Sequence, residues 1–211
     1  MALPTEFYYE QIKKHKKRLR KKSRFLNLLS LLRVLVFFGT VYLTYYYFFD
    51  YRISLSIAIS GIIAFIVLVS IYSNIKYQES KLAALIEINE NELKTLNRNF
   101  EFRDTGSEFA DNNHDFSSDI DLFGKGSFFQ YLNRTNTNAG KELLASMLLS
   151  NNIDRITDKQ EAVKELCDKP EWRQDFSATA SLIKPETPTN TILNWLLNYE
   201  PYLTQRMAFL P

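Results

Sequence analysis

The sequence predicts an all-α protein in which a two-span membrane hairpin precedes a helical cytoplasmic part. Three observations carry this prediction. Two uncharged apolar runs, residues 34–49 and 53–72, are separated by only three residues, and a dense basic stretch precedes the first run. The rest of the chain has helical periodicity, with no alternating strand pattern of useful length.

The basic stretch, residues 13–24, contains nine Lys and Arg and no acid. It forms the centre of a predicted N-terminal arm, residues 1–30. An excess of Lys and Arg before a first span predicts that this end stays in the cytoplasm. A nucleic-acid-binding tail is the alternative interpretation, but the position beside a span favours anionic lipid headgroups, at about 1 kcal/mol for each basic residue. The expected lipid contacts are Lys13, Lys14, Lys16, Lys17, Arg18, Arg20, Lys21, Lys22 and Arg24.

Residues 31–72 are predicted to form the transmembrane hairpin. A bilayer core of about 30 Å takes roughly 20 helical residues, and the second run fits that length without a charge. Arg33 lies near the cytoplasmic end of the first span, where its side chain can extend back to the headgroups. Ser56, Ser60 and Ala64 recur at every fourth position, which predicts close packing of the second span on the first. Tyrosines gather at the far end, as in an interfacial aromatic belt: Tyr42, Tyr45, Tyr46, Tyr47 and Tyr51.

The topology follows from the same features. A signal peptide is a poor match because the basic region is long, no small-residue cleavage site follows, and a second span comes at once. A two-span hairpin returns the chain to its starting side, so both termini are expected in the cytoplasm. Neither span has an acid, a histidine or a second basic residue in its middle, so transport chemistry is not predicted. Cys167 is the only cysteine, which excludes an intrachain disulfide.

Residues 73–99 are predicted to be an amphipathic juxtamembrane helix, followed by a linker at 100–118. The apolar residues of the helix fall within one stripe, which also includes Asn89. Asn89 could set the register of a coiled coil, whereas the small number of heptads favours packing against the soluble part. The linker is rich in Gly, Ser, Asn and Asp and has no sustained period. The stripe consists of Leu82, Leu85, Ile86, Leu93 and Leu96.

The last predicted region, residues 119–211, is a helical domain that is expected to be incomplete. Thr157 and Gln160 have the spacing of a capping box, and Pro170 suits the first turn of a helix. We expect Trp172 and Trp195 to pack in a core and Cys167 to be a buried small apolar residue. The predicted helices are 127–133, 139–150, 158–168, 170–182 and 189–198.

No catalytic, cofactor-binding or metal-binding residue is predicted. The stretch 124–127 (Gly-Lys-Gly-Ser) lacks both the upstream glycine and the Ser or Thr after the lysine of a phosphate-binding loop. A calcium loop over 119–130 fails because Phe123 replaces an oxygen ligand and Gln130 cannot supply a bidentate carboxylate. His15 and His114 are the only histidines, in the arm and the linker, so no histidine site can be assembled.

Residues 117–183 carry a series of elements in order: 126–135 (Gly-Ser-Phe-Phe-Gln-Tyr-Leu-Asn-Arg-Thr), 138–144 (Asn-Ala-Gly-Lys-Glu-Leu-Leu), Ile153 with Ile156, and 159–166 (Lys-Gln-Glu-Ala-Val-Lys-Glu-Leu). This series resembles the core or lever region of the MutS family of ATP-driven mismatch-repair clamps. Thr137 and Gly140 match the family's Thr-x-x-Gly helix start, while Lys159 replaces an arginine. The family's Phe-x-Glu mismatch motif does not occur, and a membrane hairpin stands in place of the mismatch-recognition and connector domains.

The resemblance implies a membrane-associated bacterial relative, tethered to the inner membrane, of which this chain supplies the anchor and a helical lever. It also implies a DNA partner, a homodimer, and ATP with Mg²⁺ in an ATPase domain beyond this chain. The alternative is a membrane scaffold that binds a protein and neither DNA nor nucleotide. Outside residues 13–24 the chain has only 17 of its 26 Lys and Arg against 24 acids. That acidic balance lacks the broad basic footprint of a DNA-binding domain.

Overall fold

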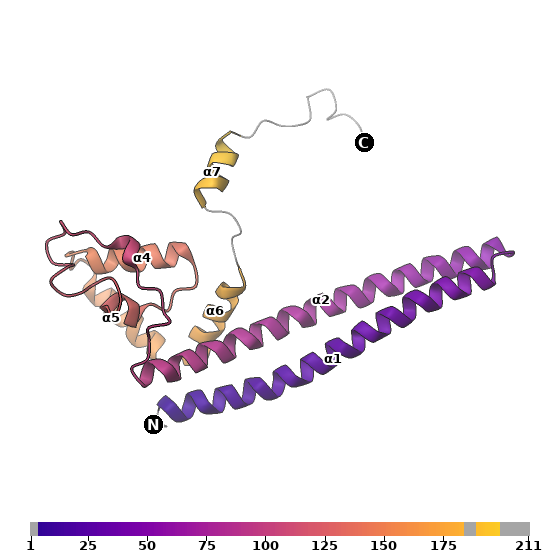
Figure 1. The fold of residues 1–211 in the computed structure, drawn as a ribbon, viewed down its shortest axis with the longest axis horizontal. Coiled ribbons are helices and arrows are strands. Elements are labelled where there is room, and N and C mark those ends of the chain that lie inside the picture. Colours follow the sequence, from indigo (N-terminus) through magenta and orange to yellow (C-terminus); the bar gives the residue numbers. More distant parts are fainter. Residues whose placement is uncertain (1–3, 184–188, 199–211) are drawn as a thin grey trace.

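The computed structural model describes residues 4–183 and 189–198 (Figure 1). Over these residues the all-α prediction is confirmed, because the chain is helical and contains no strand. Five short helices follow two long ones, and their starts and ends lie within two residues of the predicted positions. The elements are α1 (Pro4–Tyr46), α2 (Tyr51–Leu96), the 3-10 helix η1 (Ser107–Phe109), α3 (Phe128–Leu132), α4 (Asn138–Leu149), α5 (Ile156–Cys167), α6 (Pro170–Leu182) and α7 (Thr189–Leu197).

Helices α1 and α2 form one long antiparallel hairpin (Figure 1). They contain 43 and 46 residues, so each is about 65–70 Å long at 1.5 Å per residue. That is about twice the thickness of a bilayer core. Asp50 caps α2, its carboxylate accepting a hydrogen bond from the backbone N–H of Ile53 at 3.4 Å. The predicted arm is therefore continuous with the first span from Pro4 onward, and the juxtamembrane helix with the second span.

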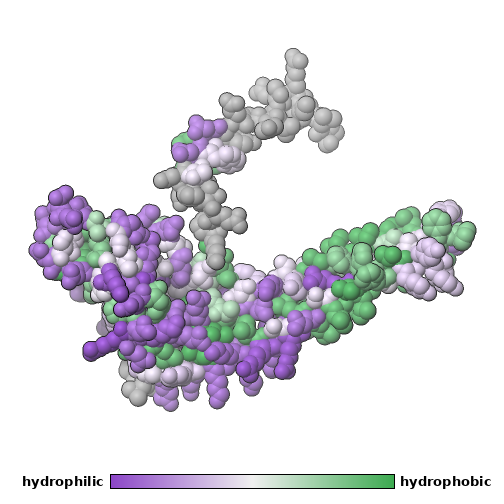
Figure 2. Space-filling model, viewed as in Figure 1, coloured by the Kyte–Doolittle hydropathy of each residue, from purple (hydrophilic) through white to green (hydrophobic). Residues whose placement is uncertain are grey.

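The half of the hairpin next to the α1–α2 turn is apolar and exposed (Figure 2). Both long helices are long and apolar enough to cross a membrane. In α2, none of the most apolar 18-residue window is buried within the protein. A core helix of a soluble protein hides such residues, and exposed apolar surface of this extent needs a nonpolar environment to cover it.

The face on which the two spans pack differs from the predicted one. Ser56, Ser60 and Ala64 are exposed, and the two hydroxyls donate to carbonyls of their own helix. The contact is made instead by Gly61, where an added Cβ would lie 2.3 Å from the side chain of Thr40. The prediction was wrong because several positions of this span are small, and periodicity alone does not show which of them faces α1.

Arg33 and Tyr72 mark the level at which the apolar half of the hairpin ends. The Arg33 guanidinium, which the sequence predicts to extend to the headgroups, lies over the Tyr72 ring with its Cζ 4.0 Å from the ring centroid. Its buried Nε has no hydrogen-bond partner among the described residues. A cation over an aromatic face is stabilised by the ring quadrupole, most strongly where water is scarce. This pair therefore joins the two spans.

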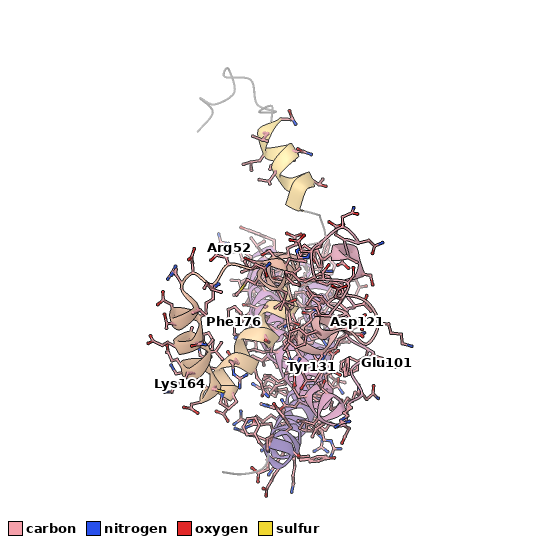
Figure 3. The ribbon with its side chains drawn as sticks, turned by 90° about the vertical axis from the view of Figure 1, so that its left-hand side faces the viewer. Arg52, Glu101, Asp121, Tyr131, Lys164 and Phe176 are labelled. Atoms are coloured by element: carbon pink, nitrogen blue, oxygen red, sulfur yellow. The ribbon has the colours of Figure 1, made fainter. Side chains whose placement is uncertain are left out.

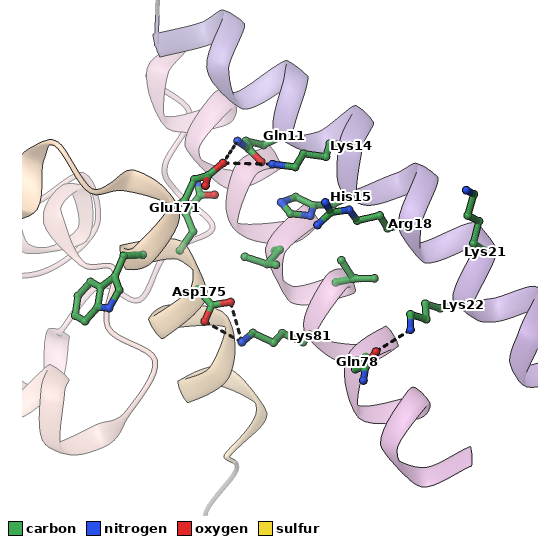
Figure 4. Close-up of a pocket in the computed structure, with 14 residues that line it drawn as sticks. Gln11, Lys14, His15, Arg18, Lys21, Lys22, Gln78, Lys81, Glu171 and Asp175 are labelled. Atoms are coloured by element: carbon green, nitrogen blue, oxygen red, sulfur yellow. Dashed lines mark hydrogen bonds and ion pairs between the residues drawn. The ribbon is translucent and has the colours of Figure 1, made fainter. Parts of the chain in front are cut away.

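Beyond that level α6 packs on α2 beside α1 (Figures 1 and 4). Leu26 and Leu29 of α1 and Leu85 and Ile86 of α2 are buried there. Asn89, also on the stripe, is fully buried and pairs with a glutamine of α6. The central part of the stripe is thus packed within the protein, as predicted, whereas Leu96 at its end is 49% exposed.

The predicted linker is an ordered loop that is packed around α3. Phe129 is fully buried and contacts the rings of Phe109 and Phe123. Gln130, also fully buried, donates from Nε2 to the carbonyls of residues 101 and 103 and accepts at Oε1 from the N–H of Gly126. Gly106 has φ of 64°, and a Cβ there would lie 2.6 Å from the Phe129 ring. This loop therefore depends on a side-chain network rather than on regular structure.

Several local predictions for the C-terminal helices are wrong. Helix α5 begins after Arg155, which adopts a left-handed conformation, so Thr157 lies inside the helix and does not cap it. Cys167 is exposed, as are Trp172 and Trp195, at 56% and 61%. For Trp172 the reason is that α6 packs its Gln174 face against α2, which leaves the face with Trp172 exposed.

Candidate functional site

Helices α1, α2 and α6 meet in a polar joint at the polar half of the hairpin. Basic residues of α1 and α2 face two acids of α6. The Glu171 carboxylate accepts hydrogen bonds from Gln11 at 3.0 Å and from Lys14 at 3.3 Å, and these bonds lower its pKa below the usual range. Lys81 pairs with Asp175 at 2.8 Å. These pairs are largely exposed, so each contributes only about 0–1 kcal/mol, and together they fix the direction in which α6 lies.

A reciprocal amide pair stands at the centre of this joint. Asn89 donates from Nδ2 to Gln174 Oε1 at 3.1 Å, and Gln174 donates from Nε2 to Asn89 Oδ1 at 2.9 Å. Asn89 also donates to the Leu85 carbonyl at 2.7 Å. Asn89 is fully buried and Gln174 is 8% exposed. Each amide therefore satisfies the other in a place where water cannot replace it.

We expect Asn89→Leu to loosen α6 from α2, because Gln174 would keep a buried amide without a partner. The cost of such a group is about 1–3 kcal/mol. The measurement is thermal unfolding in detergent, together with hydrogen exchange of the α6 backbone. The double variant Asn89→Leu with Gln174→Leu should recover most of the loss, since no polar group is then stranded. Asn74→Leu, on an exposed part of α2, serves as the control and should change neither quantity.

A pocket of about 810 Å³ opens beside this pair, between α1, α2 and α6 (Figure 4). Its charged lining is mostly basic. Lys14 and Lys81 are neutralised by Glu171 and Asp175. Lys22 donates only to the neutral Gln78, at 2.8 Å, and Arg18 has no hydrogen bond or ion pair among the described residues. The basic lining residues are Lys14, His15, Arg18, Lys21, Lys22 and Lys81.

His15 lies on the α1 side of this pocket and is 7% exposed. Its Nδ1 is buried and has no hydrogen-bond partner within the described part of the chain. Burial lowers the pKa of the imidazole below its usual value, and the charges of Lys14 and Arg18 lower it further. The sequence places this histidine in a basic arm and gives no sign of burial, because the helices that cover it are distant in the chain.

The remaining basic residues of α1 face outward. A second open pocket of about 720 Å³ on α1 is lined by Lys13, Lys16, Lys17, Arg20, Lys21 and Arg24. Lys16 also pairs with Glu90 of α2 at 2.7 Å. The arm is thus divided between a side buried against the protein and a side open to solvent. Since α1 is continuous, its rise places Lys13 about 30 Å from Arg33 along the helix axis.

A second charged cluster joins the end of α2 to the ordered loop. Glu92 of α2 accepts from Arg103 at 2.9 Å and from Arg134 at 3.1 Å. Arg103 also donates to the Asn133 carbonyl at 3.0 Å. Burial and the nearby Arg134 lower the pKa of Arg103, and Glu92 acts in the opposite direction. Figure 3 shows Glu101 of the loop and Tyr131 of α3 on one side of the α2 axis. Lys164 of α5 lies on the other side.

The elements of the MutS resemblance have structural roles in this arrangement. Ser127 caps α3, its hydroxyl accepting from the N–H of Gln130 at 3.1 Å. The hydroxyl of Thr137 caps α4 by accepting from the N–H of Gly140 at 3.1 Å, as the Thr-x-x-Gly pattern predicts. Arg134 of the Arg-Thr element reaches Glu92. These side chains order loops and helix starts.

The weak motifs form no site of their own. Residues 124–127 make a turn that leads into α3. His114 lies far from His15 in the fold, its Nε2 3.2 Å from the Leu149 carbonyl. No group of three or more His, Cys, Asp or Glu that could hold a metal ion is found among residues 4–183 and 189–198. Comparisons with protein-family models, curated proteins and solved structures give no match for this chain.

Proposed function

We propose that this chain is the membrane anchor and lever region of a MutS-like protein of the bacterial inner membrane. The observation that carries the proposal is the continuity of α2. One helix runs without a break from an exposed apolar half to the buried Asn89 and the charged Glu92. A helical unit docked on its polar half is therefore held at a fixed height above a bilayer, and a displacement of that unit acts directly on the hairpin.

The MutS-like part of the proposal is supported by the order and capping of the short helices. α3, α4 and α5 begin within two residues of the positions that the matched motifs predict, and Thr137 caps α4. On this proposal a homodimer is the working form. ATP and Mg²⁺ act only in an ATPase domain beyond this chain, and DNA is the partner of the assembled protein.

Membrane contact beyond the spans is proposed for the basic residues closest to Arg33. Arg24 lies about 14 Å from Arg33 along the helix, whereas Lys13 lies about 30 Å away. The headgroup layer is only about 5–8 Å thick on each side. We therefore propose that Arg24, Lys22 and Lys21 meet anionic headgroups first, and that the more distant residues of the arm face the cytosol or the protein.

The topology can be tested with Cys167, the only cysteine, which is exposed. If both termini are cytoplasmic, a membrane-impermeant maleimide should label Cys167 only after the inner membrane of spheroplasts is opened. The matched control is Phe49→Cys in a Cys167→Ser background, since Phe49 is fully exposed at the hairpin turn. It should be labelled in intact spheroplasts. Labelling of Cys167 in intact spheroplasts would contradict the proposed topology.

A membrane scaffold that binds a protein is the second candidate, and one observation favours it. Large apolar side chains of the short helices remain exposed, and uncovered patches of this kind mark interaction surfaces. Most of the outward-facing basic residues of α1 also lie together around the second pocket on that helix, rather than over a broad surface. Among the exposed apolar residues of these helices are Leu143, Met147, Val163, Trp172 and Phe176.

Binding of double-stranded DNA separates the two candidates. The full chain in phosphatidylcholine nanodiscs is titrated with a labelled duplex at stepped salt, since phosphate contacts make affinity fall linearly on a logarithmic salt scale. The MutS-like proposal expects binding that survives Lys13→Gln, Lys17→Gln, Arg20→Gln and Arg24→Gln together. Binding that disappears in this variant, or no binding at low salt, favours the scaffold.

A further inference from the structure

We propose that the pocket between α1, α2 and α6 binds a phosphate-bearing ligand, held by Arg18, Lys22 and His15. This inference does not depend on the MutS resemblance. It comes from the lining of a preformed cavity of about 810 Å³, a volume in the usual range for small-molecule sites.

The first argument is the charge that remains after the internal pairs are formed. Glu171 and Asp175 are occupied by Lys14 and Lys81. Arg18 and Lys22 then have no acidic partner among the described residues, although both line the pocket. An anion with two or more charges compensates both cations, and phosphate groups accept charge-assisted hydrogen bonds from Arg and Lys with favourable geometry.

The second argument is the buried imidazole. His15 is 93% covered by the protein, and its Nδ1 has no hydrogen-bond partner within the described residues. Figure 4 shows His15 and Arg18 extending from α1 toward α2, and both line the pocket. A buried polar atom without a partner calls for an explanation, and an unfilled ligand position is one. A protonated imidazole donates hydrogen bonds from both ring nitrogens, whereas a neutral imidazole donates from only one. Protonated His15 therefore has an N–H at Nδ1 to donate to a phosphate oxygen.

The charges around His15 determine how a ligand is detected. Lys14 and Arg18 of α1 and Lys81 of α2 disfavour the protonated imidazole, and Glu171 and Asp175 of α6 favour it. Without a ligand, burial and the nearby cations keep the pKa of His15 below its usual value. A phosphate beside the ring reverses the balance, because an opposite charge stabilises the imidazolium. Binding should therefore raise the pKa of His15.

The position of the pocket allows two sources for the phosphate. Gln78 lies at the membrane-facing end of the pocket, about 9 Å from Tyr72 along the axis of α2. The side chain of Lys22, which pairs with Gln78, is long enough to extend from there to the headgroup layer. The opposite end, at Gln11 and Glu171, is about 30 Å from Arg33 and faces the cytosol. Either a lipid headgroup or a soluble phosphate compound can supply the anion.

The test follows the pH titration of the two histidines by NMR, using the full chain in nanodiscs. One arm adds inorganic pyrophosphate to phosphatidylcholine discs, and the other replaces phosphatidylcholine by phosphatidylglycerol. A rise in the pKa of His15 in the first arm assigns a soluble ligand, and a rise in the second assigns a headgroup. His114, in the distant loop, is the internal reference and should not shift.

Two variant pairs of equal charge separate a built site from a diffuse field. Arg18→Gln with Lys22→Gln removes two of the three lysines and arginines of the pocket that have no acidic partner among the described residues, the third being Lys21. This variant should bind the ligand about tenfold or more weakly. Lys17→Gln with Arg20→Gln removes the same charges from the outward surface of α1 and should change affinity less than about twofold. An unchanged His15 titration in both arms, or equal losses in both pairs, overturns the proposal. Circular dichroism of the variants verifies the fold.

Discussion

Glu92→Gln should lower the free energy of unfolding by about 2–4 kcal/mol, because it strands a mostly buried guanidinium. Glu92 and Arg103 have side-chain exposures of 17% and 11%. With the carboxylate gone, Arg103 keeps only neutral acceptors, namely Thr95 Oγ1, the Asn133 carbonyl and the amide oxygen of the new glutamine. Arg134 loses its acidic partner as well. The ordered loop is then tied to the end of α2 by hydrogen bonds to neutral acceptors, such as that from Arg103 to Thr95.

The measurement is thermal unfolding of the full chain in detergent, with an expected fall in Tm of roughly 5–15 °C. Hydrogen exchange should rise over residues 100–135 and stay unchanged over the apolar half of the hairpin. Glu101→Gln is the matched control in the same loop. Its carboxylate is 69% exposed and lies 3.6 Å from Lys125, so its loss should be near zero. Equal effects of the two substitutions would show that Glu92 is an ordinary surface acid.

Gly61→Val should separate α1 and α2 in the apolar half of the hairpin. An added Cβ at this position would lie 2.3 Å from both Cγ2 and Oγ1 of Thr40, so the helices cannot keep their present contact. Thr40 cannot easily turn away, because its hydroxyl donates to the Val36 carbonyl at 2.7 Å. Overpacking of this kind costs about 1–3 kcal/mol, and the axial separation should increase by about 2 Å.

The separation can be measured as the distance between spin labels at exposed Leu35 and Ser70, in a Cys167→Ser background. Gly39→Val is the control in the facing span, because a Cβ at Gly39 meets nothing within 4 Å. It should leave the distance unchanged. Thr40→Gly combined with Gly61→Val should restore the close approach. If both valine variants behave alike, helix propensity rather than contact with Thr40 governs the pairing.

The sequence was most informative where a property is local. The apolar runs give the two long helices, since their length and lack of charge are visible without any partner. The proline at the start of α6 was predicted for the same reason, since a helix start involves only residues a turn apart. For α4, the Thr-x-x-Gly match of the family resemblance placed the helix start at Thr137, which caps the helix. The predicted Thr157 cap was wrong because the helix begins two residues earlier, with Arg155 as its N-cap in a left-handed conformation.

The candidate site was hidden from the sequence for the opposite reason. His15, Lys81 and Glu171 are far apart in the chain, and only the packing of α6 on the hairpin brings them to one pocket. Nothing near His15 in the sequence indicates burial. The same holds for Gln130, whose side chain orders a loop nearly thirty residues upstream.

By itself the sequence determined that two apolar helices form a hairpin and that a basic stretch precedes the first of them. Both features depend on side-chain hydrophobicity and on the length of each run, which are local properties. Tertiary structure alone decided which small residue faces the other span, where the basic side chains find acids, and which tryptophans stay uncovered. Those outcomes depend on the shape and charge of surfaces from distant segments. A periodic pattern fixes the faces of a helix, and only packing decides what each face meets.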